Sequence, residues 1–100
     1  MNITVKEVKE KMDQGESFTL IDVREQHEHD EFNIGGTLIP LSTLPHILDT
    51  LEDKKDSELV MYCRSGARSA SAQQFLLQNG FTNVKNMTGG VLEWREKIGS

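Results

Sequence analysis

The residues around Cys63 are of types that could activate its thiol for chemistry. This cysteine, the only one in the 100-residue chain, is followed by a short polar segment with two arginines and two serines: Arg64, Ser65, Gly66, Ala67, Arg68 and Ser69. Positive charge and hydrogen-bond donors favour the thiolate, which is the nucleophilic form of cysteine. The same groups attract anions. The segment therefore predicts a nucleophilic thiolate in an anion-binding loop.

The elements on either side of this segment should aim its backbone at the sulfur. Residues 59–62 form an apolar, β-favouring run, and residues 70–79 form an alanine-rich helical segment. The order is therefore buried strand, tight loop and helix. Backbone N–H groups converge at a helix N-terminus, and the helix dipole adds partial positive charge there. A cysteine in this position is better suited to chemistry than to packing.

Three other roles for Cys63 compete with this interpretation. Free cysteine is often a buried packing residue, and position after an apolar strand alone leaves that role open. Zinc takes about four ligands at recognisable spacing, whereas this chain has one cysteine and three scattered histidines, His27, His29 and His46. We expect those histidines at the surface, and we expect no metal and no cofactor. A Cys–His catalytic pair is possible in principle, but nothing in the sequence places a histidine beside Cys63.

Loop length separates two chemistries that use such a thiolate. Cysteine phosphatases need an arginine that grips the phosphoryl oxygens at the position corresponding to Ser69, and here the arginine comes one place earlier, at Arg68. A shorter loop forms a narrower cradle. It favours a sulfur atom delivered to the thiolate over a tetrahedral phosphate.

Composition limits the partners and the compartment. The net charge is −5 and the isoelectric point is near 5.1, which argues against nucleic acid as the main partner. One cysteine cannot form an internal disulfide and suits a reducing compartment. No apolar run has the length of a signal peptide core or a membrane span. We expect one cytoplasmic domain over residues 1–100, with no membrane partner.

The rest of the chain alternates helical and strand-like patterns. Thr4 and Glu7 have capping-box spacing and Gly15 ends that first helix; Ser42 is expected to cap a helix that buries Leu44, Ile47, Leu48 and Leu51. Other helices are predicted at 26–32 and 91–98, and other strands at 18–23, 37–41 and 81–87. This alternation indicates an α/β sandwich with a mostly parallel sheet. Ligands bind such sheets at the carboxyl ends of the strands, where residues 22–25 and the segment after residue 62 should meet.

Individual residues near these strand ends have more specific predicted roles. Arg24 is expected to form a structural ion pair with Asp22 or Glu31, because charged residues at strand ends are buried only when paired. Gly66 should adopt a backbone angle that other residues resist. Ser65 and Ser69 either donate hydroxyls to the site or cap the helix that follows. Separately, Trp94 is expected in the core with Val91 and Ile98.

Four stretches in order resemble the rhodanese (thiosulfate sulfurtransferase) family in its compact single-domain bacterial form. They are a strand ending in Asp-Val-Arg at 20–25, the run 32–41 that leads into Ile-Pro, the loop 63–69, and residues 80–84 with Gly89, Gly90 and Trp94. The second stretch departs from the family pattern. Asn33, Gly35 and Thr37 stand where histidine, proline and alanine are usual.

The resemblance implies a rhodanese-like three-layer α/β/α sandwich around a mostly parallel sheet of about five short strands. It also implies a sulfurtransferase in which Cys63 attacks the outer sulfur of thiosulfate or a similar donor, sulfite leaves, and a persulfide forms. Backbone N–H groups of residues 64–69 would cradle the persulfide, Arg68 would bind the donor with Arg64 at the rim, and Asp22 and Arg24 would support the site. The implied partners are a small anionic sulfur donor and an external thiol, protein or cyanide acceptor.

Two functions of other classes stay open. Some members of this family bind or regulate partners without catalysis, and the loop could recognise such a partner. A phosphatase or arsenate reductase could use the same thiolate, although the early position of Arg68 argues against it.

Overall fold

The computed structural model describes residues 1–99, and their strands form one parallel sheet in the order β1-β5-β4-β2-β3. The strands are β1 (Asn2–Ile3), β2 (Thr19–Asp22), β3 (Thr37–Leu38), β4 (Leu59–Tyr62) and β5 (Val84–Met87). The α-helices are α1 (Val5–Asp13), α2 (Gln26–Glu31), α3 (Ala67–Gln78) and α4 (Gly90–Lys97), and two 3₁₀ helices are η1 (Leu41–His46) and η2 (Leu48–Lys54). The predicted α/β fold is confirmed.

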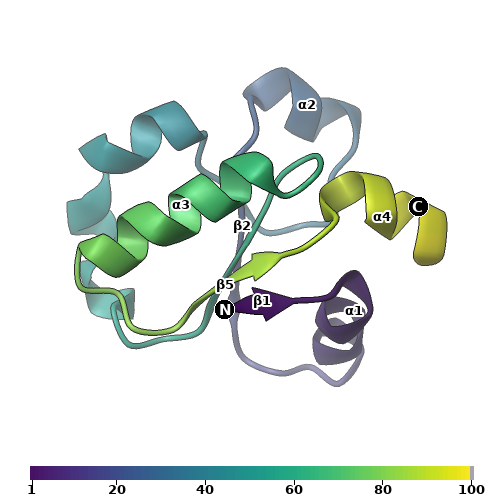
Figure 1. Cartoon of the computed structure of the whole chain (residues 1–100), viewed down its shortest axis with the longest axis horizontal. Helices are drawn as coiled ribbons and strands as arrows, with labels where there is room; N and C mark the ends of the chain where they lie inside the picture. The colour runs from purple at the N-terminus through teal and green to yellow at the C-terminus, as the bar shows by residue number, and fades with distance from the viewer. Residues whose placement is uncertain (100) are drawn as a thin grey trace.

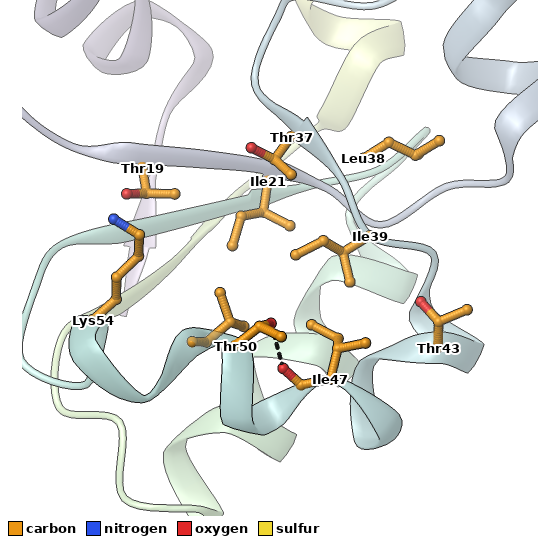
Figure 2. A pocket seen from close by; sticks show the side chains of 10 residues that line it. Thr19, Ile21, Thr37, Leu38, Ile39, Thr43, Ile47, Thr50 and Lys54 are labelled. Carbon is orange, nitrogen blue, oxygen red and sulfur yellow. Dashed lines mark hydrogen bonds between the residues drawn. The ribbon is translucent and has the colours of Figure 1, made fainter.

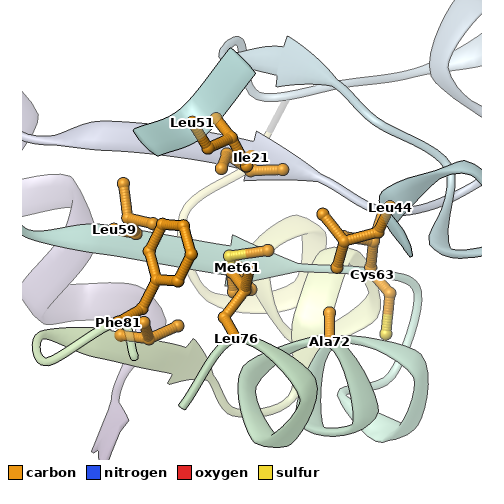
Figure 3. Close-up of a cluster of buried hydrophobic side chains, with 11 residues drawn as sticks. Ile21, Leu44, Leu51, Leu59, Met61, Cys63, Ala72, Leu76 and Phe81 are labelled. Atoms are coloured by element: carbon orange, nitrogen blue, oxygen red, sulfur yellow. The ribbon is translucent and has the colours of Figure 1, made fainter. Parts of the chain in front are cut away.

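The sheet is the middle of three layers, as Figure 1 shows. One face packs under α3, η1 and η2, through a core that includes Ile21, Met61 and Leu76 (Figure 3). The other face packs against α1 and α4, through a core that includes Val8, Val60 and Trp94. The predicted burial of Trp94 is confirmed. The α/β/α sandwich implied by the family resemblance is therefore present.

The layers bring three segments to the carboxyl end of the sheet. Helix α2, the loop before α3 and the first turn of α4 gather at this end in Figure 1. Strand β4 lies between β2 and β5, with Asp22 in register with Tyr62. The end of β2 and the loop after β4 are therefore neighbours, as the sequence predicted.

The prediction of an α-helix that begins after Ser42 is wrong. Residues 41–54 form η1 and η2 instead, Pro40 occupies the N-cap position of η1, and the Ser42 side chain is exposed. Pro45 is the fifth residue of η1; proline has no N–H to donate, and its ring clashes with the carbonyl four residues earlier. The segment therefore closes short turns, such as Ile47 N–H to Leu44 O at 3.2 Å. The expected inner residues still face the core, with Leu44 fully buried.

Other elements also differ from the prediction, and strands β3 and β5 are shorter than the predicted strands 37–41 and 81–87. Helix α3 begins at Ala67 and not at Ala70, because Gly66, with φ of 108°, already turns the chain into the helix. The polar residues that follow look like loop in sequence but form the first turn. Strand β1 was not predicted; its two residues are too few for a pattern, and pairing with β5 defines it. The capping box of Thr4 and Glu7 is confirmed.

Candidate active site

Cys63 lies directly after β4 with its sulfur directed toward the start of α3. Figure 3 shows its side chain above Ala72 of α3 and beside Leu44. The residue is only 1% exposed. Backbone N–H groups of Gly66 and Ser69 nevertheless donate to Sγ, at 3.1 Å and 3.4 Å. The cysteine is thus buried as a packing residue is, but its sulfur faces hydrogen-bond donors.

These donors favour the thiolate. Burial raises the pKa of the Cys63 thiol, because a charged sulfur loses its contact with water. Hydrogen bonds from the Ser69 hydroxyl and from the amides of Ser69, Gly66 and Ser65 outweigh that effect, and the pKa lies below its ordinary value. Of the two open roles for Ser69, helix capping is excluded because Gly66 takes the N-cap position, and the Ser69 hydroxyl lies within hydrogen-bond distance of Sγ.

A buried hydrogen-bond network anchors the loop to β5. The Ser69 hydroxyl lies 3.4 Å from Sγ of Cys63 and donates to Oδ1 of Asn86 at 2.5 Å. The Asn86 side chain in turn donates to the Gly66 carbonyl at 3.3 Å. Asn86 was not among the site residues predicted from the sequence; its one signal is an asparagine within a strand that is otherwise largely buried.

Helix α4 fixes the first part of the loop. The amides of Val91 and Leu92 donate to the carbonyls of Cys63 and Arg64, at 2.9 Å and 3.0 Å. A side chain on Gly90 would not fit, because its Cβ would lie 2.5 Å from the Cys63 carbonyl oxygen. Gly90 therefore permits the close approach of α4 to the loop.

At the end of β2, Asp22 binds Arg24 of the following loop and His29 of α2. The predicted ion pair is present: both carboxylate oxygens of Asp22 accept from the Arg24 guanidinium, at 2.9 Å and 2.8 Å. Burial raises the pKa of Asp22, but the bonds from Arg24 and His29 outweigh it and hold that pKa below its usual value. Nδ1 of His29 donates to this carboxylate at 2.8 Å. Of the three histidines expected at the surface, His27 and His46 are exposed, but the expectation is wrong for His29, whose side chain is only 19% exposed.

The two loop arginines point to different surroundings. Arg68 pairs with Glu28 of α2, with both guanidinium N–H groups on the two carboxylate oxygens at 2.7 Å and 2.9 Å. The Arg68 guanidinium lowers the pKa of Glu28 to about 2. Arg64 lines a cavity of about 200 Å³ between α2 and α4, whose lining also includes Glu28, Glu31 and Arg95. Glu28 was not among the site residues predicted from the sequence.

A larger cavity of about 400 Å³ lies apart from the cysteine, between the sheet edge and the 3₁₀ helices. Figure 2 shows Ile21, Ile39 and Ile47 around it and Lys54 at one end. Its lining includes none of residues 63–69. We therefore assign the candidate site to the loop and not to this cavity.

The loop in which the sequence departs from the family pattern is tied to the site. Oδ1 of Asn33 accepts from the Gly35 amide at 2.9 Å, and the Tyr62 hydroxyl donates to the Gly35 carbonyl at 2.9 Å. Tyr62 directly precedes Cys63. Asn33 and Gly35 thus form a loop that is held to the end of β4, while Thr37 begins β3.

Comparison with known proteins identifies the family. A family profile described as a Rhodanese-like domain matches residues 4–97. The chain belongs to the rhodanese family. Among relatives, this rhodanese domain is 34% identical to a tRNA uridine(34) hydroxylase of Photorhabdus laumondii over 77% of the chain. It is 33% identical to the probable adenylyltransferase/sulfurtransferase MoeZ of Mycobacterium tuberculosis over 96% of the chain.

The match covers only part of these relatives. The chain spans 23% of the hydroxylase and 25% of MoeZ.

Solved structures of similar size exist as well. A rhodanese-like domain protein from Staphylococcus aureus is 30% identical with a TM-score of 0.84, covering 94% of this chain and 91% of that one. The human single-domain sulfurtransferase TSTD1 is 29% identical with a TM-score of 0.81, covering 96% of each chain.

Two further features concern metals and membranes. Within residues 1–99, no group of three or more histidine, cysteine, aspartate or glutamate side chains is arranged to bind a metal ion. None of the helices in this described range has the length and apolar character that a membrane crossing requires.

Proposed function

We propose that this rhodanese domain is a sulfurtransferase that carries sulfane sulfur as a persulfide on Cys63. The observation that carries the proposal is the convergence of the Gly66 and Ser69 amides on a buried sulfur whose pKa is lowered. A cysteine that only fills space has no need of such donors. The relatives named as sulfurtransferases, MoeZ and human TSTD1, support the same activity.

In the proposed first half-reaction the donor is thiosulfate or a similar small anion. The Cys63 thiolate attacks the outer sulfur of thiosulfate, a new sulfur–sulfur bond forms, and the bond to the sulfonate group breaks. Sulfite leaves with the bonding electron pair, and the outer sulfur of the persulfide keeps a negative charge. Helix geometry leaves the amides of Ala67 and Arg68 without carbonyl partners inside α3, so they are available to that sulfur.

In the second half-reaction an external thiol, on a small molecule or a protein, or cyanide removes the outer sulfur. Attack on that sulfur breaks the bond to Cys63 and returns its thiolate. An external acceptor is required because the chain has no second cysteine. We further propose a reducing, cytoplasmic setting, which keeps the thiol free. A net charge of −5 supports acceptors other than nucleic acid.

The intact mass of the protein after incubation with thiosulfate tests this proposal. We expect a gain of one sulfur atom, its removal by cyanide with formation of thiocyanate, and no gain in the Cys63→Ala variant. Ser71→Ala is a suitable control, because this serine is exposed on the same helix. A sulfur gain that persists in Cys63→Ala would contradict the proposal.

One observation favours a second function, a binding or regulatory module. Cys63 is only 1% exposed, so little of its surface is open to a donor. If neither thiosulfate nor an organic hydropersulfide adds sulfur to Cys63, the binding module becomes the better assignment. Hydrolysis of p-nitrophenyl phosphate that depends on Cys63 would instead favour a phosphatase.

A further inference from the structure

Glu28 already occupies the position on Arg68 that an anionic substrate would take. Arg68 is the second residue of α3, one residue before Ser69, whose amide donates to Sγ of Cys63. Its two terminal N–H groups bind both oxygens of Glu28, at 2.7 Å and 2.9 Å. Guanidinium groups bind carboxylates and other oxyanions through this same two-pronged geometry. A sulfonate on thiosulfate and the Glu28 carboxylate therefore compete for one set of donors.

Glu28 is held in place from its own side. It is the third residue of α2, its Oε1 accepts from the Glu25 amide at 3.0 Å, and its side chain is 21% exposed. Helix α2 is also fixed to the end of β2, because Nδ1 of His29 donates to Asp22. Figure 1 shows α2 lying at the end of the sheet near the start of α3. The carboxylate is thus a positioned part of the site and not a freely moving surface group.

We propose that Glu28 determines donor specificity by competing with anionic donors for Arg68. This inference rests on the proposed function, since it concerns the sulfur donor of the same cysteine. A dianion such as thiosulfate must displace Glu28 before Arg68 can bind its sulfonate. An organic hydropersulfide, whose transferable sulfur carries no sulfonate group, does not need Arg68 and is not affected. The domain therefore favours hydropersulfides over thiosulfate, and Glu28 causes that preference.

A structural brace between α2 and α3 is the competing explanation for the same ion pair. Glu28→Gln separates the two explanations, because glutamine keeps the size and one acceptor oxygen but removes the negative charge. Glu31→Gln is the matched control. It makes the same change in net charge on the same helix, at an exposed residue that lines the Arg64 cavity as Glu28 does but forms no ion pair with Arg68.

The first measurement is the rate of Cys63 persulfide formation as a function of donor concentration. In Glu28→Gln the thiosulfate concentration for half-maximal rate should fall about fivefold, the factor that a partly exposed ion pair supports. The maximal rate should change less. With an alkyl hydropersulfide that bears no sulfonate or carboxylate group as donor, both parameters should stay within about twofold of wild type. Glu31→Gln should resemble wild type with both donors.

The second measurement does not depend on sulfur transfer. Iodoacetate and iodoacetamide alkylate the same thiolate, but only iodoacetate is an anion. In Glu28→Gln the ratio of the two alkylation rates should shift several-fold toward iodoacetate, and in Glu31→Gln it should not.

The outcomes distinguish this inference from the proposed function. If the ratio shifts but no donor adds sulfur to any variant, the anion competition holds and the sulfurtransferase assignment fails. If wild type forms a persulfide but Glu28→Gln matches Glu31→Gln in both measurements, the sulfurtransferase assignment holds and Glu28 is only a brace. A lower melting temperature in Glu28→Gln with no change in donor preference likewise shows that Glu28 is only a brace.

Discussion

Replacing Ser69 by alanine should weaken the Cys63 thiolate without removing the loop amides. The Ser69 hydroxyl lies 3.4 Å from Sγ, while the amides of Gly66 and Ser69 keep their own bonds to sulfur in the variant. A hydroxyl has one proton, and in the resting structure Asn86 at 2.5 Å competes for it. The contribution of the hydroxyl to the thiolate therefore lies at the lower end of the usual range.

The size of the effect follows from hydrogen-bond energies. Bonds to charged groups contribute about 1.5–3 kcal/mol, so we expect a loss of about 1.5 kcal/mol. That corresponds to about a tenfold decrease in the ratio of thiolate to thiol at a fixed pH below the pKa of Cys63. The variant also leaves the buried Oδ1 of Asn86 without its hydroxyl donor, which costs about 1–3 kcal/mol of folding free energy.

Ultraviolet absorbance of the thiolate, titrated against pH, measures the first effect, and urea unfolding measures the second. Ser71→Ala serves as the control, because its hydroxyl is exposed and bonds only within the helix backbone at Ala67. If Ser69→Ala loses stability but titrates like wild type, the hydroxyl supports packing alone and the account of the thiolate is wrong on this point.

Three other substitutions test the surroundings of the loop by urea unfolding. Asp22→Asn leaves the buried guanidinium of Arg24 without its charge partner, so we expect a loss of about 3–5 kcal/mol; a loss below about 1 kcal/mol contradicts the buried pair. Gly90→Ala should destabilise the protein by about 2 kcal/mol more than Gly15→Ala. Both glycines have positive φ, 58° and 67°, so the backbone strain of alanine is common to the two variants. Only at Gly90 would the added Cβ collide with neighbouring backbone. Equal losses would show that α4 can move away. The third substitution is Glu28→Gln, compared with wild type as the pH falls from 4.5, the ordinary pKa of a glutamate, to about 2, the pKa of Glu28 in the folded protein. Over this range wild type should lose about 1 kcal/mol of unfolding free energy relative to the variant. The reason is that a carboxyl whose pKa is lowered by folding stabilises the fold while it is ionised, and this stabilisation is lost as it is protonated. If the difference in unfolding free energy between wild type and Glu28→Gln stays constant over this pH range, the ion pair is contradicted.

Local patterns were sufficient to predict the elements that position the cysteine. The apolar run before Cys63 and the alanine-rich segment after it defined the strand and the helix, because each is decided by residues close in sequence, although the helix begins at Ala67 and not at Ala70. The capping box at Thr4 was likewise local. The ion pair between Arg24 and Asp22 was predictable because the two residues lie on one short segment.

Contacts between distant segments were not predictable from one sequence. Arg68 and Glu28 are 40 residues apart, and a free arginine near the cysteine looks the same in sequence as a paired one. Asn86 reaches the loop only because β5 lies beside β4. The 3₁₀ helices at 41–54 were missed for a different reason. Apolar spacing favoured an α-helix there, but Pro45 prevents the backbone hydrogen bonds that one needs.

The most direct test of the account is whether the loop amides respond when sulfur is added to Cys63. Amide resonances of a nitrogen-15-labelled sample, recorded before and after thiosulfate, report this residue by residue. The account predicts shifts concentrated in residues 64–69, together with a mass gain of one sulfur atom, while α1 on the opposite face stays unchanged. A sulfur atom bound to the protein with the resonances of Gly66 and Ser69 unmoved would contradict it.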